Sequence, residues 1–121
     1  MRRFEELRVW QESRALVKDI YTLTEPLKDW SFKDQIRRAA VSVMNNIAEG
    51  SESGSDANFT RFLNVAKGSC GEVRSMLYLM NDLFPIDEQQ ISALQNRAER
   101  ISSNIYNLIV YLNTNNNKLN D

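Results

Sequence analysis

The fold is decided by the stretch Gln35-Ile-Arg-Arg-Ala-Ala-Val-Ser-Val-Met-Asn-Asn-Ile-Ala-Glu-Gly50, whose apolar side chains recur at the three- and four-residue steps of an α-helix. With successive residues placed about 100° apart, one stripe is predicted to face a core. It contains Ile36, Ala39, Ala40, Val43 and Ile47. The polar residues gather mainly on one flank: Gln35, Arg38, Ser42, Asn45, Asn46 and Glu49. The stretch therefore predicts a helix with an unusually localised polar side.

Three further segments show the same period on either side of this helix. The four predicted helices cover residues 4–24, 31–50, 56–83 and 87–112. Pro26 and Pro85 are expected to end the first and third helices. The expected N-caps are Ser31 for the second helix and Ser55 or Asp56 for the third, and Gly50 is the expected C-terminal stop of the second.

Length and composition fit one domain, because 121 residues with 42% hydrophobic content can bury a single core. Four helices with short connections predict an all-α, up-down-up-down antiparallel four-helix bundle over residues 1–113. Residues 114–121 are polar and rich in asparagine, and we expect a flexible tail there. No apolar run approaches the roughly 18 residues that span a bilayer, and no secretory signal is evident, so we expect a cytoplasmic protein without membrane association.

Residues that usually carry catalysis are scarce. Histidine is absent, and the sequence contains no nucleotide-binding, metal-binding or nucleophile motif. The single cysteine, Cys70, falls on the apolar stripe of its helix, so we expect a core thiol. Glu49 and Glu72 could pair if their helices meet, but bundle carboxylate sites normally draw on more ligands. We therefore expect no enzyme activity, no cofactor, no metal and no small-molecule substrate.

Short polar and small residues mark a predicted contact surface on the second and third helices. Two glycines inside the third helix cost about 1 kcal/mol each relative to alanine, unless they let another backbone approach closely. The candidate residues for this polar network or subunit interface are Gln35, Ser42, Asn45, Asn46, Glu49, Asn64, Gly68, Gly71, Glu72 and Ser75. The alternative is a modestly polar solvent-facing surface, with glycines that only tolerate a bend.

The charges are nearly balanced, with 15 basic and 16 acidic residues, so no strongly basic footprint for nucleic acid is present. Repetition of a small basic patch around an oligomer could still create avidity for RNA or DNA. The candidate contacts are Arg2, Arg3, Arg8, Arg14, Lys18, Arg37 and Arg38. The alternative for Arg37 and Arg38 is a solvated or salt-bridged pair.

Several blocks resemble one known family. They are Phe4-Glu-Glu-Leu-Arg-Val-Trp-Gln11, Gln35-Ile-Arg-Arg-Ala-Ala-Val-Ser42, Asn46-Ile-Ala-Glu-Gly50 and Phe62-Leu-Asn-Val-Ala-Lys-Gly-Ser69 with Glu72. Together they are similar to the four-helix-bundle proteins of the 23S rRNA intervening-sequence family, to which the retroelement accessory variability proteins look related. The resemblance implies a homopentameric ring of four-helix protomers with no established enzymatic activity. It also implies, for the retroelement relatives, binding of nucleic acid and a reverse transcriptase through a basic surface.

The chain departs from this family in two respects, one of which is its slightly negative overall charge. Where members often carry a basic residue after the Asn-Ile-Ala-Glu-Gly block, this chain has Ser51-Glu52-Ser53. We therefore expect a non-enzymatic, homo-oligomeric binding or scaffold protein, with a nucleic-acid-binding accessory protein as the alternative.

Overall fold

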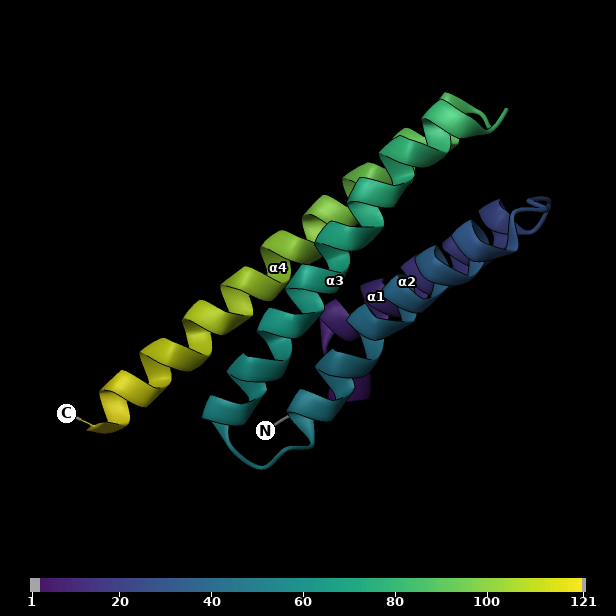
Figure 1. Ribbon diagram of the computed structural model, residues 1–121. Coiled ribbons are helices and arrows are strands. Elements are labelled where there is room, and N and C mark those ends of the chain that lie inside the picture. The colour runs from purple at the N-terminus through teal and green to yellow at the C-terminus, as the bar shows by residue number, and fades with distance from the viewer. Residues whose placement is uncertain (1–2, 121) are drawn as a thin grey trace.

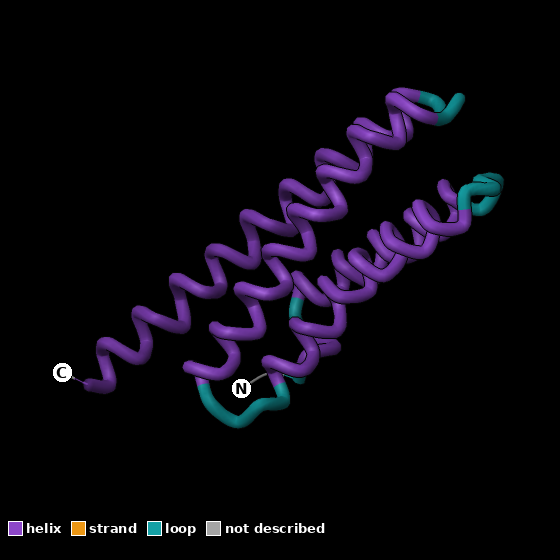
Figure 2. Tube along the Cα trace, viewed as in Figure 1, coloured by secondary structure: helices purple, strands orange, loops and turns teal. Residues whose placement is uncertain are grey.

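The computed structural model describes the backbone of residues 3–120 and the side chains of residues 3–114. It contains a short 3-10 helix, η1 (Phe4–Glu6), followed by α1 (Arg8–Thr24), α2 (Trp30–Ser51), α3 (Asp56–Leu83) and α4 (Glu88–Asn120). Figure 1 shows the four α-helices side by side, and Figure 2 shows only helices and loops in this part of the chain. The predicted all-α four-helix bundle is confirmed.

Each helix packs against two neighbours, which closes the bundle. Helix α2 contacts α1 and α3, while α4 contacts α3 and α1. Figure 1 shows two hairpins, one formed by α1 and α2 and the other by the longer α3 and α4. The loops that close these two hairpins lie at the same end of the bundle. Between residues 3 and 120, no helix is both long and apolar enough to cross a membrane.

The core follows the predicted stripes. The five stripe residues of α2 are at most 4% exposed, and Leu16 and Ile20 of α1 are fully buried. The apolar residues that repeat at helical steps in α3 and α4 are mostly buried as well, whereas Phe62, Phe84 and Leu108 are half-buried. The hydrophobic periodicity therefore identified most of the residues that hold the helices together.

Two predicted helix starts are wrong in detail. Helix α2 is capped by Asp29, whose carboxylate accepts a hydrogen bond from the Phe32 N–H at 3.0 Å, and not by Ser31. Asp29 has the extended backbone of an N-cap, whereas Ser31 already lies inside the helix. The first predicted helix is also interrupted, because Leu7 is extended between η1 and α1.

The loop between α2 and α3 matches the prediction at one end only. Ser55 caps α3 by accepting a hydrogen bond from the Asn58 N–H at 3.1 Å, as predicted. Gly50, the predicted stop of α2, is instead buried inside the helix, which ends one residue later. The glycine that turns the chain is Gly54, whose φ of 87° is readily accessible only to glycine.

At the C-terminus, α4 continues as far as Asn120 and thus includes most of the segment predicted to be a flexible tail. Asp121 lies outside the described residues. The flexibility of residues 114–121 stays a prediction.

Candidate functional site

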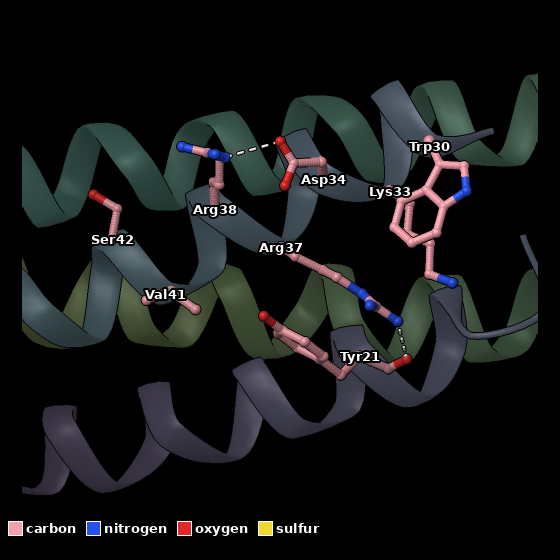
Figure 3. A pocket seen from close by; sticks show the side chains of 8 residues that line it. All are labelled: Tyr21, Trp30, Lys33, Asp34, Arg37, Arg38, Val41 and Ser42. Carbon is pink, nitrogen blue, oxygen red and sulfur yellow. Dashed lines mark hydrogen bonds and ion pairs between the residues drawn. The ribbon is translucent and has the colours of Figure 1, made fainter. Parts of the chain in front are cut away.

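A shallow groove of about 510 Å³ runs along the outer side of α2, next to the end of α1 (Figure 3). It is lined by Tyr21, Trp30, Lys33, Asp34, Arg37, Arg38, Val41 and Ser42. The α2 members recur at steps of three and four, which places them on adjoining faces of one helix. The groove combines two aromatic rings with three basic side chains, and we call it the basic aromatic groove.

Trp30 is the most exposed of the large hydrophobic residues in the described part of the chain, at 76%. It is the first residue of α2 and follows the capping Asp29 directly, so the start of the helix fixes its backbone. The Lys33 ammonium lies 5.3 Å from the centre of the Trp30 ring. The same ammonium donates a hydrogen bond to the Glu25 carbonyl oxygen at 3.1 Å. A flat aromatic surface is thus held open to solvent beside a positive charge.

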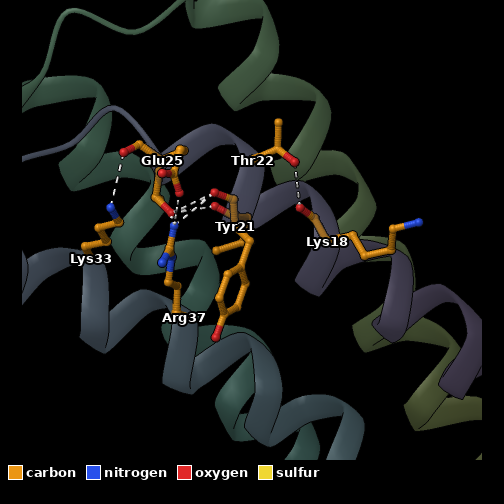
Figure 4. A network of polar contacts seen from close by, with 8 residues as sticks. Lys18, Tyr21, Thr22, Glu25, Lys33 and Arg37 are labelled. Atoms are coloured by element: carbon orange, nitrogen blue, oxygen red, sulfur yellow. Dashed lines mark hydrogen bonds and ion pairs between the residues drawn. The ribbon is translucent and has the colours of Figure 1, made fainter.

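Arg37 joins α2 to the C-terminal end of α1 (Figure 4). Its guanidinium donates to the Thr24 hydroxyl at 3.0 Å, the Tyr21 carbonyl at 3.1 Å and the Glu25 carboxylate at 3.3 Å. It also lies 4.2 Å from the centre of the Tyr21 ring, and its side chain is only 17% exposed. Carbonyls at a helix C-terminus lack partners within the helix, and a cation satisfies them well. Arg37 therefore acts first as a contact between helices.

We expect Arg37→Ala to lower the free energy of unfolding by about 1.5–3 kcal/mol, the range for hydrogen bonds to charged groups. Arg38→Ala is the matched control, because that side chain is 80% exposed and pairs only with Asp34 at 2.8 Å. The control should change stability by less than about 1 kcal/mol. Urea denaturation of both variants measures the difference, and equal losses would contradict the role given to Arg37.

The other predicted basic contacts do not gather in this groove. Arg3 pairs with Glu5, Arg8 reaches Glu12 at 4.0 Å, and the Arg14 guanidinium lies 5.6 Å from the centre of the Trp10 ring. Lys18 is exposed on α1, and Arg2 lies outside the described residues. Of the six predicted residues that the structure describes, Arg37 and Arg38 alone line this groove, with Lys33 as a member that the sequence did not indicate.

The predicted polar flank of α2 forms a small hydrogen-bond cluster with α3. The Ser42 and Ser69 hydroxyls are 2.7 Å apart, and the Asn46 amide donates to the Ser42 carbonyl at 2.8 Å and hydroxyl at 3.0 Å. Gln35, Asn45 and Glu49 are exposed instead. The sequence missed Ser69, although Phe62, Ala66, Ser69 and Val73 recur at steps of four, three and four.

The predicted residues on α3 lie on its outer side. The Asn64 amide donates to the Thr60 carbonyl of the same helix at 3.1 Å, and Gly68, Gly71, Glu72 and Ser75 are exposed. A Cβ atom built on Gly68 or Gly71 would meet nothing within 4 Å. No neighbouring helix described within the bundle uses the space that these glycines leave, so a contact there would have to come from outside the protomer.

Cys70 is a core thiol, as predicted. It is fully buried, and its sulfur donates to the Ala98 carbonyl at 3.0 Å. Burial raises the pKa of the thiol from 9.0 to about 11, and the charge of Arg74 opposes this only in part. The stability that depends on the protonated thiol is therefore complete below about pH 9 and is lost as the pH rises through about 11. At neutral pH the thiol is a poor nucleophile.

The fold and these surfaces define a small four-helix-bundle protein with polar contacts between its helices and with glycines on its outer side. The chain belongs to the 23S rRNA-intervening sequence protein family, whose model matches residues 5–107. A crystal structure of a protein of unknown function from the S23 ribosomal protein family of Bacteroides thetaiotaomicron is similar. It has 25% sequence identity and a TM-score of 0.78, over 84% of this chain and 97% of that chain. None of the curated proteins matches.

Proposed function

We propose that the protein is a non-catalytic, cytoplasmic homo-oligomer, most simply a pentameric ring, that serves as a binding or scaffold module. The observation that carries this proposal is an exposed ridge along α3, formed by Val65, Gly68, Glu72, Ser75, Leu79 and Leu83. These residues recur at steps of three and four, so they share one face of the helix. This spacing of the ridge residues is typical of a helix that packs against another helix.

The composition of the ridge favours close packing between copies. Val65, Leu79 and Leu83 are 50%, 44% and 56% exposed, so each has apolar surface left to bury. Full burial of such a side chain is worth about 1.5–3 kcal/mol. Gly68 has open space where a Cβ would lie, which would let a partner backbone approach. An ordinary solvent-facing ridge would carry several charges, and this one carries Glu72 alone.

A ring needs two different contact surfaces on each subunit, because each copy must meet two neighbours in a head-to-tail manner. Helix α4 offers a second surface. Tyr106, Val110 and Tyr111 are 56%, 43% and 60% exposed on it. Seven of the nine exposed large hydrophobic residues in the described part of the chain lie on α3 and α4. This distribution supports contacts through the α3–α4 hairpin and leaves the α1–α2 side accessible.

We expect Leu79→Glu to dissociate the oligomer, since it replaces an apolar side chain of the ridge with a charge. Size-exclusion chromatography with light scattering measures the mass, which should fall from about 70 kDa for five 14.0 kDa chains toward that of one chain. Ser31→Glu is the control, because Ser31 is exposed on α2, in the hairpin that the proposed contacts leave accessible. A monomeric wild type at micromolar concentration would overturn the proposal.

The chemistry of the side chains supports a role without catalysis. The chain has no histidine, and its one thiol is buried and protonated at neutral pH. The sequence therefore cannot supply a nucleophile that is activated by a histidine base.

The basic aromatic groove favours a second candidate function, the binding of single-stranded RNA or DNA. Nucleic-acid bases stack on exposed aromatic rings, and basic side chains contact the phosphates. Trp30 supplies such a ring and the exposed Arg38 supplies charge in the same groove, whereas Lys33 is largely buried, at 8% exposure. The α1–α2 hairpin that carries this groove is not the one that carries the ridge, so each copy in a ring could present its groove.

We expect Trp30→Ala to weaken binding of a labelled single-stranded RNA by roughly 5- to 150-fold, since one stacked base is worth about 1–3 kcal/mol. Fluorescence anisotropy at two salt concentrations measures this. Tyr78→Ala is the control, because Tyr78 is 62% exposed on α3, away from the groove. Undetectable binding by the wild type at low salt, or equal effects of both variants, would remove this candidate.

A further inference from the structure

A second groove, larger and more apolar, is lined by residues of both hairpin loops. These loops lie at the same end of the bundle (Figure 1). Its volume is about 800 Å³. The apolar part of its lining includes Leu23, Leu27, Phe84, Ile86, Ala93 and Leu94. These residues come from α1, both loops and α4. We call it the loop-end groove.

One side of the groove is formed where α1 ends and the chain turns toward α2. Helix α1 ends at Thr24, and Pro26 follows within the loop. Leu23, Leu27 and Ile86 pack against the core on one side but remain only half-buried, and Ala93 is exposed. Phe84 packs edge-to-face on Phe32, with ring centres 5.2 Å apart, which fixes one wall. The apolar surface is therefore preformed and uncovered within the protomer.

The rim of the loop-end groove is acidic. Three carboxylates line it, those of Asp19, Asp29 and Asp87, against the single ammonium of Lys28. Asp29 accepts a hydrogen bond from the Phe32 N–H, and Asp87 accepts one from the Gln89 N–H at 2.9 Å. Both are therefore held in place at helix N-termini. Because Asp19 pairs with Arg97, the negative charge that the rim offers comes mainly from Asp29 and Asp87. An occupant with positive charges next to its apolar groups would match this rim.

We propose that the loop-end groove binds a segment of a partner protein in which apolar side chains are flanked by lysine or arginine. The charged lining residues Lys28, Asp29 and Asp87 are exposed, whereas Leu94 is buried, which suits a chain that lies across the groove with its apolar side chains turned inward. A small ligand is normally oriented by polar groups placed within its pocket. Among the described residues, the buried side-chain atoms without a hydrogen-bond partner belong to Thr60, Arg74 and Gln95, and none of these residues lines the groove.

The test uses the full chain and a fluorescein-labelled amphipathic helical peptide made of leucine and lysine. A leucine–glutamate peptide of the same pattern tests the charge preference, and a scrambled leucine–lysine peptide tests the need for an apolar face. Fluorescence anisotropy should show binding of the amphipathic basic peptide that is at least roughly tenfold tighter than that of the other two, a difference of about 1.4 kcal/mol.

Two substitutions on the same turn of α4 locate the binding. Ala93→Trp fills the groove and should weaken binding at least roughly tenfold, whereas Ser92→Trp, exposed but outside the lining, should leave it unchanged. Lys28→Glu should strengthen binding, since it adds a carboxylate to the rim. If Ala93→Trp does not fold, as judged by circular dichroism, Leu27→Asn in the loop replaces it.

Three results would overturn the proposal. They are equal affinity for the basic and acidic peptides, equal affinity of the Ala93→Trp and Ser92→Trp variants, and a change in the mass of the oligomer on Ala93→Trp. The last result would mean that a second copy of the chain covers the groove. The mass of the wild type is a separate measurement, so a monomeric wild type would remove the proposed ring without affecting peptide binding.

Discussion

Ile47→Ala is expected to lower the free energy of unfolding by about 2–5 kcal/mol, the range measured for large-to-small changes in protein cores. Ile47 is 0% exposed and belongs to a continuous core cluster that includes residues from all four helices. Its truncation removes the transfer free energy of the side chain and leaves a cavity that packed helices fill only in part. Since small domains are stable by only about 5–15 kcal/mol, this loss is a large fraction of the total.

Urea denaturation at one fixed protein concentration measures the change, because the stability of an oligomer depends on concentration. Ile47→Val should cost only about 0.5–1.5 kcal/mol, since it removes one methylene. Lys18→Ala is the surface control, because that side chain is exposed on α1, away from the proposed subunit contacts. If Ile47→Ala cost no more than Lys18→Ala, Ile47 would not be part of the core.

Hydrophobic periodicity was sufficient to predict the helices. The buried face of a helix requires apolar residues at every third or fourth position, and this spacing can be recognised in one sequence. The stripe from Ile36 to Ile47 and the buried Cys70 follow directly from that repeat. Helix caps were predicted less well. Asp29 and Ser31 are both good N-cap residues two positions apart, and only the backbone angles distinguish them.

The grooves could not be predicted because they depend on distances between residues far apart in the chain. Arg37 meets Tyr21 and Thr24, which are 16 and 13 positions away, and Ser42 meets Ser69 across 27 positions. Periodicity indicates which side of a helix is polar. It does not indicate which side chains of another helix those polar residues contact. Trp30 was expected in a linker, where its exposure beside Lys33 could not be anticipated.

The two grooves adjoin at the start of α2 yet differ in charge. Asp29 lines the loop-end groove, and the next residue, Trp30, lines the basic aromatic groove. The first groove has three carboxylates and one ammonium, while the second has three basic side chains and one carboxylate. With a net charge of −1, the chain shows neither feature in its overall composition. Partners of opposite charge could therefore be bound at adjacent sites without competing for the same residues.

Gly50→Leu is expected to destabilise the protein at the upper end of the roughly 1–3 kcal/mol that overpacking costs, or beyond it. A Cβ atom at Gly50 would lie 2.8 Å from the Phe62 Cβ, 2.8 Å from the Phe59 ring and 3.3 Å from the Phe59 carbonyl oxygen. The Phe59 ring could rotate, but the Phe62 Cβ and the carbonyl move only with the backbone of α3. The substitution must therefore push α3 away from α2.

Gly71→Leu is the matched control, because a Cβ there meets nothing within 4 Å and leucine has the higher helix propensity. It should leave the protomer unchanged or stabilise it by up to about 1 kcal/mol, so the same substitution should have opposite signs at the two glycines. Urea denaturation at fixed concentration gives both values. Gly50→Ala should lie between wild type and Gly50→Leu, because the gain in helix propensity offsets only part of the overlap. Equal effects at Gly50 and Gly71 would show that Gly50 does not set the distance between α2 and α3, whereas opposite signs would show that it does.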